Sequence, residues 1–313
     1  MKEKVFVIFN TTNIGDVLVT NTLVQNIKLY FPESKVVFVC KTSIRDVAKY
    51  QDGVSDVVTC DKESLKTFGG FFNFIKNFPY KRPYAAFVTY SNERNLLISR
   101  LIGAKHIISH HKFPLWNTDE KYEMREYTHM KDKWGGLIEP LTNEHKNLPI
   151  RYMPPDVNNA LTQKLETITK PVALCCTSNF KSKDMKPEDT VELIKLLNND
   201  GYTPVMTGAG AVARELVTEI RKLGCFEFID LVDCTSFIEL AKVLKICKSC
   251  ISVDTGTLHL ANALQVAVVG IFYYWENDKW GSDANLYPAK ILAGNDVKPI
   301  DIFNSYKELI AEN

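Results

Sequence analysis

Short apolar runs rich in β-branched residues alternate with amphipathic stretches from the start of the chain. In the first half the runs lie at 4–9, 35–40, 54–60, 84–90 and 106–109. Two of the stretches between them, 16–30 and 92–102, have apolar residues at helical spacing, and Gly103 follows the second as a helix stop would. This alternation predicts βαβ units and therefore a parallel sheet.

A second alternating series follows in the other half of the chain, with apolar runs at 171–176, 203–207, 226–230, 249–254 and 266–273. The segment LPIRYMPPD at 148–156 separates the two series, and its prolines fit neither a helix interior nor a central strand. We therefore predict an α/β chain of two doubly wound, Rossmann-like domains, 1–155 and 156–299. Residues 300–313 predict a terminal helix that packs back on the first domain.

Length and charge agree with this division. A chain of 313 residues suits two domains, and 38 Lys and Arg residues against 37 Asp and Glu residues leave no charge excess for binding nucleic acid. The apolar runs are too short to cross a bilayer, and the N-terminus shows no signal-peptide pattern. We expect a cytoplasmic protein, and a monomer.

The eight cysteines are spread along the chain, and several lie inside strand-like runs. This distribution fits reduced thiols better than a disulfide framework. Cys247 and Cys250 form a CxxC pair, but neither a second pair nor a histidine cluster completes a zinc site. We expect no metal ion.

Polar residues directly after the strands are the places to look for chemistry, because open parallel sheets bind ligands beyond the carboxyl ends of their strands. The first such loop is TTNIGDVL at 11–18, in which Gly15 allows a tight turn and Asp16 begins a helix. An Asp at this place is ordinarily a helix cap. The alternative is a catalytic carboxylate.

The loop at 177–189 leaves a strand and enters a helix near Pro187. It carries Thr177, Ser178 and Lys183, and hydroxyls with a lysine near a helix N-terminus make a phosphate site. A solvated loop that happens to contain lysines explains the same residues equally well.

The loop at 252–264 follows another strand and combines Asp254, Thr255, Gly256 and His259. Free N–H groups at such a turn suit a diphosphate, and His259 is placed to donate a hydrogen bond to it. An Asp cap with a histidine on a packed helix face is the alternative.

The segment TGAGAVARE at 207–215 satisfies a dinucleotide-binding pattern through Gly208, Gly210 and Ala213, with Asp230 at the end of the next strand. The motif lies in the second half of the chain, however, and no constellation for hydride transfer follows it. We therefore do not favour a nicotinamide-dependent enzyme.

Together these loops resemble those of glycosyltransferase family 9, the bacterial heptosyltransferases. The segment at 13–39 is similar to the family's opening GD loop, helix and strand, and 84–109 is similar to a later strand, arginine-bearing loop and helix. In the second half, 183–197 resembles the family's lysine-to-proline run, and 252–264 matches its DTGxxH motif at every fixed position. The resemblance covers nearly the whole chain.

The resemblance implies a GT-B architecture, in which the two domains face a central cleft, and an inverting, metal-independent transfer from an ADP-sugar, usually ADP-heptose. It implies that no cofactor takes part. It also implies that Asp16 is the base that activates the acceptor hydroxyl and that Lys183 contacts the diphosphate or the sugar. The other implied donor-site residues are Thr177, Ser178, Glu215, Asp254, Thr255, Gly256 and His259. The other implied acceptor-site residues are Gly15, Arg94 and His129.

The family's usual acceptor is a lipid-linked lipopolysaccharide core at the inner membrane, so peripheral membrane contact is a further expectation. Aromatic and basic residues at 113–134 either line the acceptor site or pack as a surface excursion. Two departures concern the donor: Met185 replaces the family's usual aromatic residue, and FYYWEND at 272–278 replaces its GPT-like turn. A GT-B epimerase and a non-catalytic sugar-nucleotide-binding homologue are the alternatives.

Overall fold

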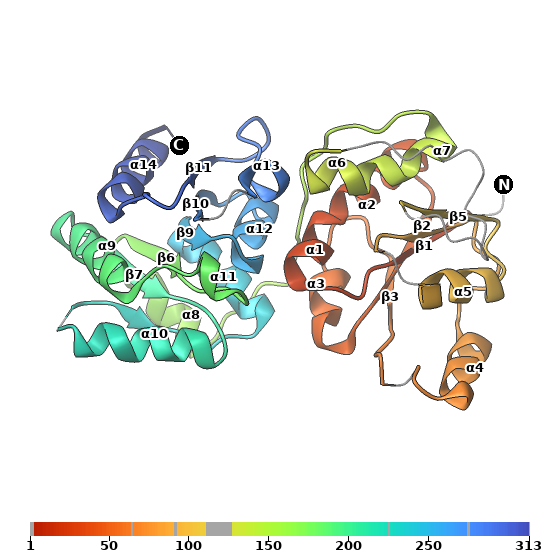
Figure 1. Ribbon diagram of the computed structural model, residues 1–313, viewed down its shortest axis with the longest axis horizontal. Coiled ribbons are helices and arrows are strands. Elements are labelled where there is room, and N and C mark those ends of the chain that lie inside the picture. Colours follow the sequence, from red (N-terminus) through yellow and green to blue (C-terminus); the bar gives the residue numbers. More distant parts are fainter. Residues whose placement is uncertain are drawn as a thin grey trace. The chain divides into compact units, whose positions relative to one another are not determined.

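A computed structural model describes residues 3–63, 65–90, 93–110, 127–224, 226–273 and 276–312. The chain forms two compact units, Met1–Ile150 and Arg151–Asn313 (Figure 1). The division falls within the proline-containing segment, a few residues before the boundary expected at 155.

The N-terminal unit is built on a parallel sheet in the order β3-β2-β1-β4-β5. Its strands are β1 (Val5–Phe9), β2 (Lys35–Cys40), β3 (Asp56–Thr59), β4 (Ala85–Val88) and β5 (His106–Ser109). Most of their side chains are buried on both faces of the sheet, as their continuous apolar runs predict. Each of the five strands expected from the sequence is present.

Helices cover both faces of this sheet, as Figure 1 shows. They are α1 (Ile14–Val19), α2 (Asn21–Tyr30), α3 (Arg45–Lys49), α4 (Phe68–Asn77), α5 (Glu93–Leu101), α6 (Met130–Gly135) and α7 (Glu139–Thr142), with short 3₁₀ turns at Thr42–Ile44 and Gly136–Ile138. The helix expected at 16–30 is interrupted at Thr20, whose hydroxyl donates to the Asp16 carbonyl at 2.7 Å.

His145 fastens the end of this unit to α6 and α7. Its Nδ1 lies 2.7 Å from Oε1 of Glu139, and its Nε2 lies 3.8 Å from Oδ1 of Asp132. The carboxylates of Asp132 and Glu139 outweigh the opposing effect of burial and raise the pKa of His145 above its ordinary value. The protonated ring is therefore stabilised in the folded state.

We expect replacement of His145 by glutamine to destabilise the protein more in acid than in alkali. A histidine with a raised folded-state pKa contributes fully below its unfolded pKa of about 6.5 and loses that contribution as the pH rises through the folded-state value. The partly exposed ion pairs limit the effect to about 1 kcal/mol. Melting temperatures of the parent protein and the glutamine variant, measured from below about pH 6.5 to above the folded-state pKa, would test this prediction. An equal difference in melting temperature at every pH would contradict the role given to protonated His145.

The C-terminal unit has a parallel sheet of its own, in the order β11-β10-β9-β6-β7-β8. Its strands are β6 (Pro171–Cys175), β7 (Thr203–Met206), β8 (Ile229–Asp230), β9 (Ser249–Val253), β10 (Ala267–Phe272) and β11 (Ala289–Ala293). The sequence pattern missed β11, a partly exposed edge strand that pairs only with β10 in the described residues. The expected α/β fold with two parallel sheets is confirmed.

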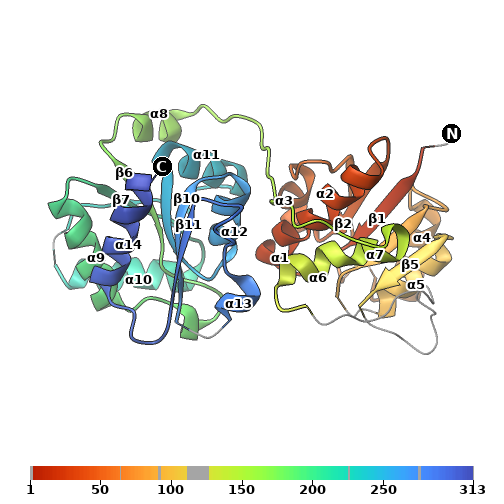
Figure 2. The ribbon, with the colours of Figure 1, turned by 90° about the horizontal axis from the view of Figure 1, so that it is seen from above.

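Two groups of helices sandwich the second sheet (Figure 2). The helices are α8 (Ala160–Glu166), α9 (Pro187–Asn199), α10 (Ala211–Lys222), α11 (Phe237–Cys247), α12 (Gly256–Ala263), α13 (Asn277–Trp280) and α14 (Pro299–Glu312), with a 3₁₀ turn at Lys181–Lys183. On one face α9, α10 and α14 share a core with the strands, while α11 and α12 contact the strands from the other face.

The terminal helix α14 packs within the C-terminal unit, which differs from the expected packing on the first domain. Ile302, Tyr306 and Leu309 are buried in the C-terminal core, where α14 contacts α9, β10 and β11. The apolar face of a terminal helix shows that it packs on a core. It does not show which of two cores it joins.

Each sheet contains a point where the chain order reverses. In the first sheet β1 lies between β2 and β4, and in the second β6 lies between β7 and β9. The crossovers leave such strand pairs in opposite directions, so the loops after them separate and open a crevice at their carboxyl ends. The loops after β1, β4, β6 and β9 are therefore the places for functional side chains.

Candidate active site

Asp16 lies at the reversal point of the N-terminal sheet, in the first turn of α1. The hydroxyl of Tyr90, two residues after the end of β4, donates a hydrogen bond to Oδ1 of Asp16. No other contact of this carboxylate is present among the described residues. The N-cap position is taken by Asn13, so Asp16 is not the cap that its place in the sequence suggests.

A small polar network holds the backbone around Asp16. The side-chain amide of Asn10 donates to the hydroxyl of Thr20 at 2.8 Å and to the Asp16 carbonyl at 3.3 Å. The amide oxygen of Asn10 accepts from the backbone N–H and hydroxyl of Thr12 at 3.1 and 2.5 Å. The loop after β1 is therefore tied to the break between α1 and α2, which orients the first turn of α1.

Tyr90 is held in turn by a buried aromatic group. Its ring centroid lies 4.9 Å from that of Trp134 on α6, and the Trp134 ring lies 5.6 Å from that of His110. Burial and the neighbouring Asp16 charge raise the pKa of Tyr90, so its hydroxyl remains a hydrogen-bond donor at neutral pH. Tyr90 was not predicted as a site residue, although its place directly after a central strand was the available signal.

The other predicted acceptor residues are placed as follows. Gly15 precedes Asp16 in α1, and Arg94 is half-buried in the first turn of α5, where its charge acts on Cys60. His129 is the N-cap of α6, and its Nδ1 accepts from the N–H of Lys131 at 3.0 Å. Among the described residues, neither Arg94 nor His129 is seen to contact Asp16, and His129 has a clear structural role.

The predicted aromatic and basic lining at 113–134 lies partly outside the described residues, which omit 111–126. Of the part that is described, Trp134 is buried, and the Tyr127 ring lies 5.9 Å from that of His110. Trp134 packs on Tyr90, whereas Tyr127 contacts His110 and His145.

Lys183 and Asp254 meet at the reversal point of the C-terminal sheet, from the loops after β6 and β9. The Lys183 Nζ lies 2.5 Å from Oδ2 of Asp254 and 3.4 Å from Oε2 of Glu276, which follows β10. Oε1 of Glu276 lies 3.3 Å from Nζ of Lys279. Two lysines and two carboxylates therefore form one cluster at the carboxyl edge of the sheet.

The members of this cluster differ in exposure. The exposed fractions of the Asp254, Lys183 and Glu276 side chains are 8%, 20% and 40%. Burial opposes the charge of Lys183, but its hydrogen bond to Asp254 and the nearby carboxylates outweigh this and raise its pKa. The lysine is thus a fixed cation. Glu276 was missed as a site residue because its segment was noted only as a departure from the family.

Thr177 and Ser178 lie beside this lysine in the chain. The hydroxyl of Ser178 is used within its own loop, since it donates to the Phe180 carbonyl at 2.8 Å and accepts from the Phe180 N–H at 3.0 Å. Thr177 is near the next loop, because its hydroxyl oxygen lies 3.7 Å from where a Cβ on Gly208 would be. Met185 is buried in the core.

Helix α12 begins directly after Asp254. Thr255 is its N-cap but makes no side-chain capping bond, and Gly256 is its first residue. The first N–H groups of the helix therefore have no side-chain cap, and they follow directly after the Asp254 that contacts Lys183. His259 is 5% exposed, and its ring centroid lies 5.8 Å from that of Trp280 on α13. The segment after β10 thus contacts both Lys183 and His259.

Glu215 is exposed on α10, and no contact with the lysine cluster is seen in the described part of the chain. The apparent dinucleotide pattern before it has a local structural explanation. Asp230, which would bind a ribose, instead pairs with Arg214 at 2.8 Å and Arg221 at 3.0 Å. This carboxylate is already neutralised, which disfavours a nicotinamide nucleotide here.

The CxxC cysteines are free and buried, and they lie where helix α11 leads into the amino end of strand β9. Burial raises the pKa of Cys247 to about 12 and that of Cys250 well above its ordinary value. Within the described residues, no three His, Cys, Asp or Glu side chains gather as they would around a metal ion.

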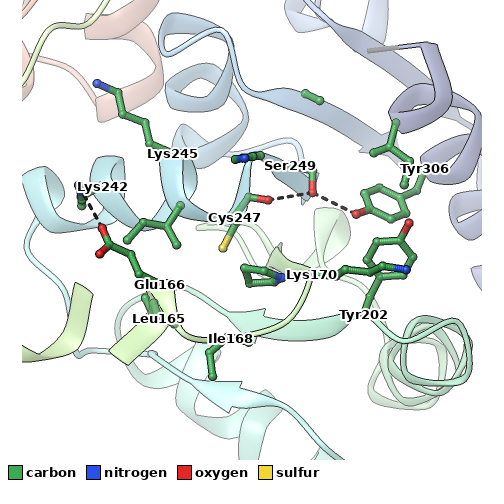
Figure 3. A pocket seen from close by; sticks show the side chains of 15 residues that line it. Leu165, Glu166, Ile168, Lys170, Tyr202, Lys242, Lys245, Cys247, Ser249 and Tyr306 are labelled. Carbon is green, nitrogen blue, oxygen red and sulfur yellow. Dashed lines mark hydrogen bonds and ion pairs between the residues drawn. The ribbon is translucent and has the colours of Figure 1, made fainter. Parts of the chain in front are cut away.

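A cavity of about 830 Å³ lies at the amino ends of strands β6, β9 and β10 (Figure 3). Pro171, Ser249 and Ala267, the first residues of β6, β9 and β10, line it. Ser249 Oγ lies 3.1 Å from Tyr306 Oη at its inner end. Because Lys183 and Asp254 follow the carboxyl ends of these strands, this cavity is not the site that they form.

Comparisons with known proteins bear on the family and the fold. Residues 96–296 match the model of glycosyltransferase family 9 (heptosyltransferase). A search of curated proteins finds no match.

Three similar solved structures cover nearly all of the chain. A family 9 glycosyl transferase from Veillonella parvula DSM 2008 is 17% identical, covers 99% of this chain and 98% of its own, and gives a TM-score of 0.86. E. coli ADP-heptose LPS heptosyltransferase II is 16% identical, with 99% of this chain and 99% of its own covered, and gives a TM-score of 0.78. E. coli heptosyltransferase WaaC with ADP is 17% identical, with 98% of this chain and 99% of its own covered, and gives a TM-score of 0.75. At these identities the structural likeness establishes the fold.

Proposed function

The chain belongs to glycosyltransferase family 9, and on this premise we propose that it transfers a heptose from ADP-heptose to a lipopolysaccharide core acceptor. The observation that carries the proposal is the pair of sites at the two reversal points. One presents the carboxylate of Asp16, and the other presents the cation of Lys183 beside the N-terminus of α12. A transferase that displaces a diphosphate needs both kinds of group.

The C-terminal unit is proposed to bind the donor. A diphosphate is stabilised by fixed positive charge, which Lys183 and the uncapped backbone N–H groups at the N-terminus of α12 supply. Asp254 holds Lys183 at this edge, and His259 lies in the first turns of α12. Two of the similar structures are an ADP-heptose enzyme and an enzyme with ADP, which supports an adenine nucleotide.

The N-terminal unit is proposed to activate the acceptor. Asp16 takes the proton of an acceptor hydroxyl as its oxygen forms a bond to the anomeric carbon of the sugar. The bond from that carbon to the diphosphate breaks, and ADP leaves with the electron pair. A single displacement of this kind inverts the anomeric configuration. Lys183 and the α12 N-terminus stabilise the leaving diphosphate in the role that a metal ion fills elsewhere.

Nucleotide-sugar binding and product analysis test this function. Ligand binding to the folded state raises the melting temperature, so we expect ADP-heptose and ADP to stabilise the protein more than UDP-sugars do. With ADP-heptose and a heptose-deficient lipopolysaccharide core, the product should be the extended core with an inverted linkage, also in the presence of a chelator. Stabilisation by UDP-sugars alone would exclude the proposed donor.

The same assay separates the alternatives. A GT-B epimerase converts the nucleotide sugar without any acceptor, whereas a transferase consumes it in step with acceptor. A non-catalytic homologue would bind the donor and turn over neither substrate. The position of Asp16, whose carboxylate is held by Tyr90 rather than used as a helix cap, favours the transferase.

A further inference from the structure

Helix α4 in the N-terminal unit carries apolar side chains on two faces. Its inner face packs on the sheet core through Phe71, Phe74 and Ile75. On the outer face Phe68 is 82% exposed and Phe72 is 47% exposed, although the ordinary place for such rings is a core. The Phe72 ring meets the Phe71 ring edge-on at 5.6 Å between centroids, but packing within this unit leaves both outer rings in contact with water.

The two outer rings form one surface. They are four residues apart on the helix, so they lie on the same side, and their centroids are 4.8 Å apart. Lys76 lies one further turn along the same stripe and is exposed. The stripe thus runs from two aromatic rings to a cation. We call Phe68, Phe72 and Lys76 the α4 stripe.

The chain around this helix is basic. Residues 62–82 contain Lys62, Lys66, Lys76, Lys81 and Arg82 but one acid, Glu63, whereas the whole chain has a net charge of +1. Glu63 is already paired with Lys66 at 2.5 Å. Lys62 and Lys76 are exposed and have no carboxylate partner among the described residues. The segment that contains the exposed rings is therefore rich in positive charge, and Lys76 carries this charge on the same side of the helix as the rings.

The helix is also weak on its own. It contains Gly69 and Gly70, and each glycine in a helix costs about 1 kcal/mol relative to alanine. A Cβ added at Gly69 would have no atom of the described residues within 4 Å, so none of them packs against that side. Only the hydrogen bond from Gly70 N–H to the Thr67 hydroxyl, 3.1 Å long, caps the first turn.

We propose that the α4 stripe docks on a bilayer surface that carries anionic headgroups. Aromatic rings on one helix face insert at the boundary of headgroups and acyl chains, and lysines beside them contact anionic lipids. Charge complementarity selects this partner, because the cation of Lys76 continues the stripe and the one acid of the segment, Glu63, is already paired. The docking is a property of the N-terminal unit and does not depend on the transfer reaction. It would place that unit at the surface where a lipid-linked acceptor resides.

Vesicle sedimentation of the full-length protein, without donor or acceptor, tests this docking. We expect binding to vesicles that contain phosphatidylglycerol and much weaker binding to phosphatidylcholine alone, with the bound fraction falling as salt rises. The double substitution Phe68→Ser with Phe72→Ser should weaken partitioning at least about tenfold, because two rings no longer leave water. Lys76→Gln should weaken it about fivefold on the anionic vesicles alone.

Leu29→Ser is the matched control, since Leu29 is 50% exposed on α2 of the same unit, and it should leave partitioning unchanged. A Phe68→Trp variant keeps a ring in place, and its added fluorescence should be quenched by brominated lipids. No vesicle binding, equal binding to neutral vesicles, or an equal loss in Leu29→Ser would overturn the proposal. So would a concentration-dependent dimer that the double substitution abolishes, because a second copy would then cover the stripe. ADP-heptose transfer is measured in a separate assay. A failure of the proposed transfer reaction would therefore not change the interpretation of the vesicle-binding result.

Discussion

Replacing Asp16 with asparagine is expected to reduce kcat by a factor of about 100 to 10,000, the usual contribution of a general base. The amide is nearly the same size and still accepts a hydrogen bond from Tyr90, so the first turn of α1 should remain in place. It cannot take a proton from the acceptor hydroxyl. Initial rates with saturating ADP-heptose and core acceptor would measure the loss, and calorimetry should show that ADP binding is unchanged.

Two further variants define what Asp16 does. Asp46→Asn removes a carboxylate from the first turn of α3 in the same unit and should keep normal turnover. Tyr90→Phe keeps the ring packing on Trp134 but removes the hydroxyl that holds Asp16, so kcat should fall about tenfold with little change in the donor KM. Normal turnover in Asp16→Asn would rule out the base assignment whatever Tyr90 does.

Replacing Lys183 with alanine is expected to weaken ADP binding about 10- to 100-fold. A charge-assisted hydrogen bond is worth about 1.5 to 3 kcal/mol, and each 1.4 kcal/mol is about a factor of ten. The variant also leaves Asp254 and Glu276 without their shared cation, so an approaching diphosphate would meet two carboxylates. Calorimetric titration with ADP measures the effect. Lys181→Ala, in the same 3₁₀ turn and exposed, is the control and should bind normally.

Glu276 provides a test in the opposite direction. Its 3.4 Å contact with Lys183 is longer than that of Asp254, and its side chain is the most exposed of the three. Glu276→Gln removes a negative charge from the phosphate position and should tighten ADP binding by a factor of about three to five. Asp278→Asn removes the same charge from an exposed position on α13 and should have no such effect. Equal affinities in Lys183→Ala and the parent protein would refute the phosphate role.

Much of the fold follows from local pattern. The apolar runs and their helical intervals predicted ten of the eleven strands in the described residues, and most of these strands are continuously apolar because they are buried on both faces. The exceptions are elements whose burial is partial. The edge strand β11 is partly exposed, and the helix α4 contains two glycines and outward-facing rings, so neither was predicted from the sequence.

The candidate site was predictable only in part. Asp16, Lys183, Asp254 and His259 stand in short motifs after strands, so the sequence indicates them. Tyr90 and Glu276 belong to no motif, and their partners Asp16 and Lys183 are distant in the chain. Conversely, Asp230 completes a spacing pattern but is already paired with two arginines.

Local sequence pattern is enough to predict that two parallel α/β sheets form and that polar residues follow their central strands, because periodicity and turn residues act over a few positions. The tertiary structure decided which of those residues meet. The order of strands brings the loop after β1 to that after β4, and the loop after β6 to that after β9. It also decided that α14 joins the second core and that two phenylalanines of α4 remain in water. Strand order and helix docking depend on the packing of the whole unit, which no local pattern contains.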